Sequence, residues 1–304
     1  SMSLNINDLK IKFGKNLIIN ENLSKYNWFN LGGPAEIFFS PQDKDQLLSF
    51  LAELKKTNIK IHVLGAGSNT LIRDLGIKGV VIKLGSKFSE TKIIGKDTIR
   101  VGASTLDKTV SNFAKDNNIS GLEFLSCIPG SIGGAVIMNS GCYGSEISGI
   151  LKSISVIDIE SVEEKIIKSD EIDFQYRGTN LPKKYIIISA VLKGNVSEKK
   201  LIESKQNEMI EKKKKSQPSK IKTGGSTFKN DSNNKAWKLI KESGSDKLFV
   251  GDAKISDKHC NFFINNGKAK ASDIERLINK VRKEVEIKTG VRLELEIEII
   301  GNEK

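Results

Sequence analysis

The segment LEFLSCIPGSIGGAVIMNSGCYGSEI, residues 122–147, combines five glycines with many apolar side chains. Gly130, Gly133 and Gly134 are too closely spaced for a comfortable helix or central strand, because each glycine loses much conformational freedom on folding. Without Cβ atoms, they let a ligand lie against backbone N–H groups. The apolar residues between them could wall a flat ring. The segment therefore fits either a cofactor loop or a tightly packed turn.

A second glycine loop, GAGSNT at residues 65–70, follows a predicted strand. It departs from the dinucleotide-binding fingerprint in three ways. The third glycine is missing, the expected acidic residue is missing, and the next strand begins too soon for the crossover helix that parallel strands require. The loop still offers backbone N–H groups, with Ser68 and Asn69 as side-chain donors. Together the two loops could hold one dinucleotide from two sides.

Length and composition narrow the class of protein. The chain has 304 residues, which suggests two or three domains, and 38% hydrophobic with 28% charged residues is typical of a soluble globular protein. The sequence shows neither a signal peptide nor an apolar run of about 18 residues, so we expect a cytoplasmic protein with no membrane partner. Three cysteines without a CxxC pair fit reduced thiols, and two distant histidines argue against a metal site and a Ser-His-Asp triad.

The formal net charge of +12 has two competing explanations, a nucleic-acid partner or a small anionic ligand. The densest lysine run, EKKKKS at residues 211–216, ends a helix predicted over residues 197–215, where cations suit the helix dipole. Aromatic residues are not interleaved with the lysines as in a base-stacking surface. We therefore predict no nucleic-acid partner, and charge alone supports that alternative.

The last forty residues have a clear pattern. Ser272 and Glu275 have the spacing of a capping box, an apolar helix face follows, and Gly290 ends the helix. The segment VRLELEIEIIG, residues 291–301, then alternates strictly between apolar residues and glutamates and predicts a strand. The simplest explanation of its glutamates is a solvated sheet face.

Seven blocks in order carry a family resemblance: NWFNLGGPAE, VLGAGSNTLIRD, the 121–147 segment, FQYRGT, GGSTFKN, GDAKISDKHCNFFIN and LELEIEIIG. Together they resemble the UDP-N-acetylenolpyruvoylglucosamine reductase family over residues 26–301. The resemblance implies an α+β protein with a two-lobed FAD-binding domain of the vanillyl-alcohol-oxidase type, followed by an α+β substrate-binding domain. The expected boundaries are 1–84 and 85–196 for the two lobes, and 197–304 for the substrate domain.

The resemblance also implies a function. The expected enzyme uses NADPH and non-covalent FAD to reduce the enolpyruvyl group of UDP-N-acetylglucosamine enolpyruvate, giving UDP-N-acetylmuramate for peptidoglycan synthesis. We expect a monomer. Another FAD-dependent oxidoreductase of the same fold with a different substrate is the alternative, although it would lack the paired GGSTFKN and LELEI blocks. Two departures from the family pattern are a short segment between Tyr176 and Lys193, as in the short-loop subclass, and Cys142 where alanine is usual.

Site residues transfer by motif. The implied catalytic residues are Arg177, which binds and polarises the substrate carboxylate, Ser226, the proton donor, and Glu296, which assists at the same carbon. This resemblance replaces the solvated-face explanation for Glu296 and leaves it for Glu294 and Glu298. Substrate contacts are implied for Tyr176, Lys229 and Asn230. The residues implied to bind FAD lie in the two glycine loops: Leu64, Gly65, Ala66, Gly67, Ser68, Asn69, Thr70, Pro129, Gly130, Ser131, Gly133, Gly134, Asn139 and Gly141.

Overall fold

A computed structural model describes residues 3–303. The chain divides into two compact units. Residues up to 18, 37–66 and 79–213 form the first unit, and residues 19–36, 67–78 and 214 onward form the second. The three-part division expected from the sequence stays a prediction.

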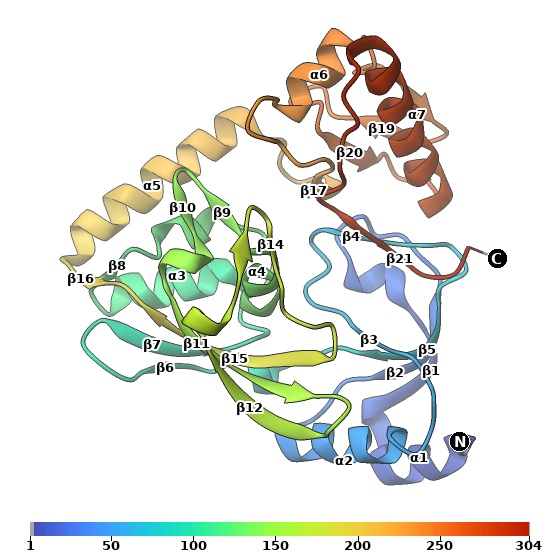
Figure 1. The fold of residues 1–304 in the computed structure, drawn as a ribbon, viewed down its shortest axis with the longest axis vertical. Helices are drawn as coiled ribbons and strands as arrows, with labels where there is room; N and C mark the ends of the chain where they lie inside the picture. The colour runs from blue at the N-terminus through green and yellow to red at the C-terminus, as the bar shows by residue number, and fades with distance from the viewer. Residues whose placement is uncertain (1–2, 304) are drawn as a thin grey trace. The chain divides into compact units, whose positions relative to one another are not determined.

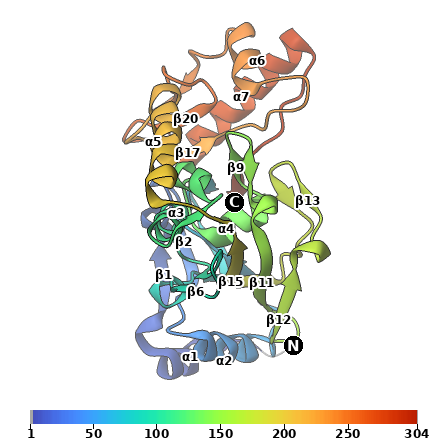
Figure 2. The ribbon, with the colours of Figure 1, turned by 90° about the vertical axis from the view of Figure 1, so that its left-hand side faces the viewer.

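The largest sheet of the first unit is antiparallel (Figure 1). Its two central strands are rich in isoleucine and valine, which suit a pleated and buried surface. Helix α4 (Ile132–Met138) contacts β15 and β7, and Figure 2 shows it beside β15. In spatial order the strands are β12 (Glu163–Lys168), β11 (Leu151–Asp158), β15 (Tyr185–Lys193), β7 (Thr98–Gly102) and β6 (Thr91–Ile93).

Another sheet has the order β1 (Leu17–Asn22), β2 (Pro34–Phe39), β5 (Ile77–Ile82) and β3 (Ile61–Val63). β3 and β5 run parallel, with Ile61 opposite Val80. The connection over residues 64–76 contains no helix, as predicted, but the expectation that so short a connection excludes parallel strands was wrong. The connection contains β4 (Thr70–Ile72), so an extended segment joins the two parallel strands in place of the usual helix.

The short helix α4 corrects a second expectation. Gly133 and Gly134 stand in its first turn, where the sequence argued against a helix. Backbone packing outweighs the low helix propensity of glycine, because the Gly133 N–H donates to the Ala103 carbonyl at 2.9 Å. A Cβ on Gly133 would lie 3.2 Å from the Ala103 Cβ. Close packing against Ala103 therefore explains this glycine.

The second unit contains an antiparallel sheet in the order β17 (Lys222–Ser226), β20 (Phe262–Asn265), β19 (Ala253–Ile255) and β18 (Phe249–Val250). The long helix α7 (Ala271–Thr289) lies against three of these strands and against α6 (Ala236–Glu242) (Figure 1). Its apolar face is buried as the sequence predicts. The buried members are Ile274, Leu277, Ile278, Val281 and Val285.

The start of α7 differs from the predicted capping box. The helix begins at Ala271, before Ser272 could act as its cap, and the carboxylate of Asp74 accepts the N–H groups of Ala271 and Ser272 at 2.9 and 3.0 Å. Glu275 instead pairs with Arg73 at 3.0 Å. A cap supplied from a distant segment satisfies the helix end, which local sequence could not reveal.

The predicted strand over residues 291–301 is mostly irregular. Only β21 (Glu298–Ile300) is a regular strand, paired in parallel with β4, while Leu295 forms an isolated bridge to Phe228. The segment changes partner between these points, and this change interrupts the strand. Leu293 and Ile297 are buried as the alternation predicts, whereas Leu295 and Glu296 are both half-buried. Elsewhere, α5 (Lys199–Ser216) matches the predicted 197–215 helix closely.

Candidate active site

The glycine-rich segment is held by backbone hydrogen bonds. The Gly130 carbonyl accepts the Asp107 N–H at 2.9 Å, and the Ile132 N–H donates to the Thr105 carbonyl at 2.9 Å. Ser131 caps α4 in an extended conformation, and Gly130 has φ 110°, which favours glycine. These contacts fix the course of the loop without using its exposed atoms.

The two glycine loops meet within the first unit. Gly65 is exposed, and a Cβ placed on it would lie 3.7 Å from the Ser131 hydroxyl oxygen. The Leu64 N–H donates to the Ile82 carbonyl at 2.9 Å, and the Lys83 ammonium donates to the Gly65 carbonyl at 2.7 Å. Burial lowers the pKa of Lys83. Lys83 was not predicted as a site residue. The sequence offered only one indication of it, which is that this lysine directly follows a predicted strand.

Two exposed residues of α4, in the glycine-rich segment, fit the flat ring system of FAD. Gly134 is exposed, and a Cβ on it would meet no described atom within 4 Å. Ile137, one turn further along α4, is 50% exposed. Open backbone beside an exposed apolar side chain is the combination that a bound aromatic ring would cover.

The rest of the 64–70 loop lies in the second unit, and Gly67 is there for packing. It has φ 72°, and a Cβ on it would lie 2.2 Å from the Tyr26 carbonyl oxygen. Its own carbonyl accepts the Trp28 N–H at 3.0 Å. Thr70 begins β4, and the Asn69 carbonyl accepts the Glu298 N–H at 2.9 Å. This half of the loop is therefore tied into its own unit.

Arg177 lies in a tight hairpin. β13 (Phe174–Gln175) pairs with β14 (Gly178–Thr179), so Tyr176 and Arg177 form a two-residue loop. Arg177 has φ 55°, an uncommon value for a residue with a side chain, and such strain is often found at functional sites. Its guanidinium stacks 4.7 Å from the Tyr176 ring centre and donates to the Gly141 carbonyl at 2.9 Å.

The hairpin is anchored to the end of α4. Asn139 has a left-handed conformation with φ 46° and is buried. Its side-chain amide donates to the Gln175 carbonyl at 2.9 Å, and its side-chain oxygen accepts the Ser148 N–H at 2.9 Å. Thr179 donates to the Ile137 carbonyl at 3.0 Å. Arg177 is thus linked to the glycine-rich helix, and Asn139 has a positioning role that its sequence match did not suggest.

The backbone segments that carry Ser226 and Glu296 pair within the second unit. Ser226 ends β17, and the Thr227 carbonyl directly after it accepts the Glu296 N–H at 2.8 Å. The Lys229 N–H donates to the Glu294 carbonyl at 2.8 Å, so the two segments run side by side. Glu296 is half-buried, whereas Glu294 and Glu298 are exposed, as predicted for solvated glutamates.

Two glycines shape the approach to Ser226. A Cβ on Gly224 would lie 2.4 Å from the Phe29 ring, so only glycine fits there. Gly225 has φ 75°, and a Cβ on it would meet no described atom within 4 Å. The register of β17 shifts between Thr223 and Ser226, as in a bulge. The close approach of a ligand to Ser226, which the sequence argument expects, stays a prediction.

Asn261 is a positioning residue that the sequence analysis missed. Its side chain accepts the Phe228 N–H at 3.1 Å and donates to the Phe228 carbonyl at 2.9 Å, while its own carbonyl accepts the Thr227 N–H. Lys229 is half-buried in the same segment. The exposed Asn230 accepts the Ala236 N–H at 2.9 Å, near the start of α6. The predicted substrate contacts of Lys229 and Asn230 stay predictions.

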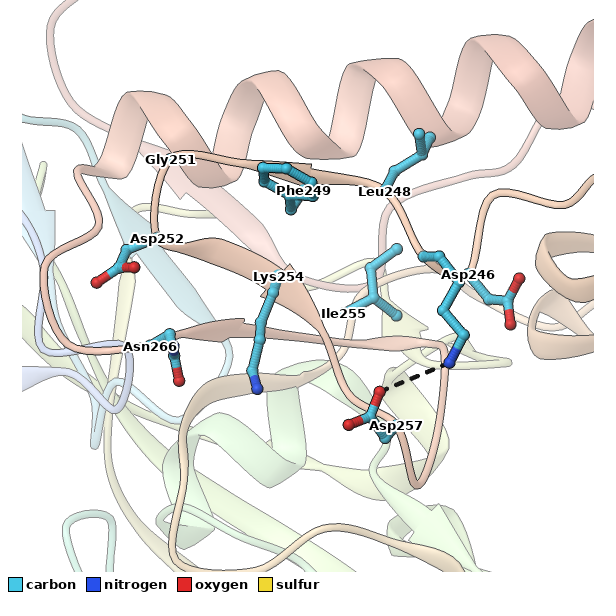
Figure 3. A pocket seen from close by; sticks show the side chains of 10 residues that line it. Asp246, Leu248, Phe249, Gly251, Asp252, Lys254, Ile255, Asp257 and Asn266 are labelled. Carbon is cyan, nitrogen blue, oxygen red and sulfur yellow. Dashed lines mark ion pairs between the residues drawn. The ribbon is translucent and has the colours of Figure 1, made fainter.

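The second unit also contains a pocket, which is lined by residues between positions 246 and 266. Its lining mixes both signs of charge, and Lys247 pairs with Asp257 at 3.7 Å (Figure 3). Phe249 is 67% exposed at its edge. The sequence-predicted site residues do not line this pocket, and it adds nothing to the candidate active site.

Comparison with known proteins defines the class. Residues 35–161 match the family described as FAD binding domain, and residues 217–300 match the one described as UDP-N-acetylenolpyruvoylglucosamine reductase, C-terminal domain. The chain is therefore an FAD-dependent oxidoreductase with an α+β fold. A vanillyl-alcohol-oxidase-type FAD-binding domain precedes the C-terminal substrate-binding domain of the reductase fold. Across the described residues, no helix combines the length and the apolar character needed to cross a membrane.

Full-length relatives define the family. UDP-N-acetylenolpyruvoylglucosamine reductase from Pelagibacter ubique is 46% identical over 91% of this chain and 92% of its own length. The protein of the same name from Rickettsia massiliae is 46% identical over 92% of this chain and 94% of its own length. The crystal structure of the reductase from Thermus caldophilus superimposes with a TM-score of 0.80 at 33% identity, covering 93% of this chain and 97% of that one. The chain belongs to the UDP-N-acetylenolpyruvoylglucosamine reductase family.

Proposed function

We propose that this chain reduces the enolpyruvyl group of UDP-N-acetylglucosamine enolpyruvate to give UDP-N-acetylmuramate in peptidoglycan synthesis, with NADPH as the hydride source. When bound, FAD would supply the hydride chemistry between NADPH and C3 of the enolpyruvyl double bond. Hydride addition leaves negative charge at C2 and on the neighbouring carboxylate. The protein then has two tasks, which are to stabilise that charge and to deliver a proton to C2.

Arg177 performs the first task. Its planar guanidinium engages the substrate carboxylate with two hydrogen bonds and stabilises the developing enolate. The stacking on Tyr176 and the hydrogen bond to Gly141 support this proposal, because they hold the guanidinium in one orientation before substrate binds. Preorganised charge needs no rearrangement during the reaction.

Ser226 performs the second task, with Glu296 as the assisting carboxylate. The single observation that carries the proposal is the pairing of the two segments through the Glu296 N–H and the Thr227 carbonyl at 2.8 Å. A serine hydroxyl is a weak acid, so proton donation to C2 requires neighbours that support the transient alkoxide. Lys229 and Asn230 contact the substrate from the same segment.

FAD is held without a covalent bond by residues of the two glycine loops, together with Asn139 and Gly141. The loop residues are Leu64–Thr70 in the first loop and Pro129, Gly130, Ser131, Gly133 and Gly134 in the second. The exposed backbone at Gly65 and Gly134 supports this assignment. Acid precipitation tests it, because the yellow flavin is expected in the supernatant. Colour retained in the washed pellet would show a covalent tether and contradict the proposal.

Turnover tests the activity itself. Purified holoenzyme is mixed with NADPH and then with UDP-N-acetylglucosamine enolpyruvate, and NADPH loss is followed together with the mass of the product. We expect NADPH oxidation that depends on the substrate and a product heavier by two hydrogen atoms. Flavin reduction by NADPH without consumption of this substrate would instead indicate a different FAD-dependent oxidoreductase.

A further inference from the structure

Two cysteine thiols lie together beside the glycine-rich loop. Cys127 ends the 3-10 helix η4 (Glu123–Cys127), and Cys142 belongs to β9 (Gly141–Cys142), which contacts η4. The Cys142 thiol donates to the Phe124 carbonyl oxygen at 3.4 Å, within the same 3-10 helix that ends at Cys127. The Cys142 sulfur therefore lies against the helical turn that carries Cys127, although the glycine-rich loop separates the two cysteines in the sequence.

Polar groups around the pair favour a thiolate on Cys127. The Ser126 hydroxyl lies 3.8 Å from its sulfur, and the Lys213 ammonium donates to the Cys127 carbonyl at 3.1 Å. The neighbouring Cys142 thiol, followed by the Ser126 hydroxyl and the Lys213 charge, lowers the pKa of Cys127 despite its burial. The Cys127 sulfur and burial raise the pKa of Cys142. The thiolate is therefore favoured on Cys127 and the thiol on Cys142.

The third cysteine has none of these features. Cys260 is buried, its thiol donates to the Trp237 carbonyl at 3.0 Å, and burial raises its pKa. A buried thiol of this kind is chemically inert. It provides an internal control for the reactivity of the pair.

We propose that Cys127 and Cys142 are a peroxide-reactive thiol pair that closes to a disulfide and thereby disturbs the active site. In the first step the Cys127 thiolate attacks one oxygen of hydrogen peroxide, a sulfur–oxygen bond forms, and the oxygen–oxygen bond breaks. Hydroxide leaves and takes a proton from solvent, which gives water and a sulfenic acid on Cys127.

In the second step Cys142 loses its proton to solvent and its sulfur attacks the Cys127 sulfur. The sulfur–sulfur bond forms, the sulfur–oxygen bond breaks, and hydroxide leaves and is protonated to water. Overall the two thiols lose two electrons and two protons, and one peroxide is reduced to two waters.

Disulfide geometry links this chemistry to the site. A disulfide holds its two Cα atoms within about 4.4–6.8 Å, so closure fixes β9 against η4. The Gly141 carbonyl, one residue before Cys142, accepts the Arg177 guanidinium, and the Pro129–Gly130 turn follows Cys127 closely. A shift of β9 would move Arg177, the proposed binder of the substrate carboxylate. A shift of η4 would move the proposed cofactor loop. This consequence rests on the proposed function, whereas the thiol chemistry does not.

Thiol mapping tests the chemistry independently of turnover. The holoenzyme is treated with hydrogen peroxide without a reducing agent, then alkylated, and its peptides are weighed. We expect a cross-linked Cys127–Cys142 peptide, removed by dithiothreitol, while Cys260 remains available for alkylation after denaturation. In Cys142→Ala, the reaction should stop at a sulfenic acid on Cys127 that dimedone traps. Loss of the nearby cation in Lys213→Gln should slow Cys127 oxidation several-fold.

Several results would overturn the proposal. Oxidation of Cys260 as fast as Cys127, or peroxide-treated protein in which Cys127 and Cys142 both remain alkylatable, would show that the pair has no special reactivity. Cys127→Ser should give no cross-linked peptide, because a hydroxyl cannot form the disulfide, and a cross-link at Cys142 in this variant would also contradict the proposal.

Activity provides the second measurement. Substrate-dependent NADPH oxidation should fall on peroxide treatment and recover with dithiothreitol. Cys142→Ala should have the basal turnover of the wild type, and it should lose no turnover through disulfide formation, because it cannot form the disulfide. An enzyme that forms the cross-link but never reduces this substrate would refute the proposed function and leave the thiol pair established. Disulfide formation without any change in turnover would refute the link to the active site.

Discussion

Arg177 and Ser226 lie on segments of opposite construction. Arg177 occupies a hairpin loop in a strained backbone conformation, and side-chain contacts from Tyr176, Asn139 and Thr179 hold that hairpin. Ser226 ends a strand, and backbone pairing with the Leu295 segment continues directly after it. Side chains thus place the proposed charge-stabilising group, whereas main-chain pairing places the proposed proton donor. Mutations should therefore misplace Arg177 more easily than Ser226.

The largest effect is expected for Ser226→Ala, because it removes the proposed proton donor while the main chain that places it stays. Flavin reduction by NADPH needs no proton on the substrate carbon, so it should remain fast. Reoxidation by the enolpyruvyl substrate should slow by about 10²–10⁴-fold, which is typical of general acid catalysis. Stopped-flow traces measure the two half-reactions separately. Reoxidation within a few-fold of wild type would remove Ser226 from the role of donor.

Arg177→Lys is expected to have the next largest effect. The charge stays, but an ammonium cannot engage a carboxylate with a planar pair of donors or stack on Tyr176 in the same way. We expect turnover to fall by about 10²–10³-fold, the usual loss when a donor to developing negative charge is removed. Steady-state kinetics with saturating NADPH measure this effect. Turnover near the wild-type rate would mean that a positive charge alone suffices in the hairpin.

The comparison also shows what the sequence could and could not predict. The helix face of α7 and the solvated Glu294 and Glu298 followed from periodicity, because side-chain burial repeats with the local geometry. The special position of Glu296 did not, since alternation treats the three glutamates alike. Its distinction arises from pairing with Thr227, which is nearly seventy positions earlier in the chain. Only the family resemblance pointed to it.

The supports of the site were the least predictable part. Asn139 and Asn261 act through hydrogen bonds to backbone groups far away in the sequence, and an isolated asparagine carries no pattern that reveals such partners. The same reason explains the cap that Asp74 supplies to α7. Glycine spacing did indicate an exposed backbone at Gly134, but it wrongly argued against a helix there, because the contact with Ala103 lies outside the local sequence.

A matched pair of asparagine variants tests the comparison directly. Asn139→Ala and Asn261→Ala each remove two side-chain hydrogen bonds to the backbone. Each should lower the free energy of unfolding by about 1–3 kcal/mol, because buried backbone groups lose their partners. Asn139→Ala should also raise the KM for substrate, since the Arg177 hairpin loosens, whereas backbone pairing should keep Ser226 in place in Asn261→Ala. Urea unfolding and steady-state kinetics measure both effects, and equal changes in KM would refute the contrast.

The smallest expected effect concerns a buried carboxyl behind the glycine-rich loop. Asp107 begins α3 (Asp107–Asp116) and is fully buried, and its carboxyl oxygens have no hydrogen-bond partner among residues 3–303. Burial raises the pKa of Asp107 well above its ordinary value of 3.8. The protonated form is therefore favoured in the folded state, and its contribution to stability is complete below 3.8 and is lost as the pH rises toward the folded-state pKa.

Asp158 in β11 provides the control of opposite sign. Burial alone would raise the pKa of Asp158, but hydrogen bonds from Lys165 and from the Glu160 and Ser161 N–H groups outweigh it and lower the pKa to about 2. Its contribution to stability is present above 3.8 and is lost as the pH falls toward 2.

Urea unfolding of both variants across pH separates the two cases. Asp107→Asn should be more stable than wild type at neutral pH, because the amide cannot ionise and avoids the cost of burying or protonating a carboxylate. This advantage should shrink as the pH falls and the carboxyl becomes protonated in the unfolded state as well. Asp158→Asn should be less stable than wild type at neutral pH, and this gap should close in acid. If Asp107→Asn is instead destabilised equally at every pH, the carboxyl oxygens of Asp107 have partners in solution. The glycine-rich loop would then pack against a hydrogen-bonded carboxyl rather than an unpartnered one.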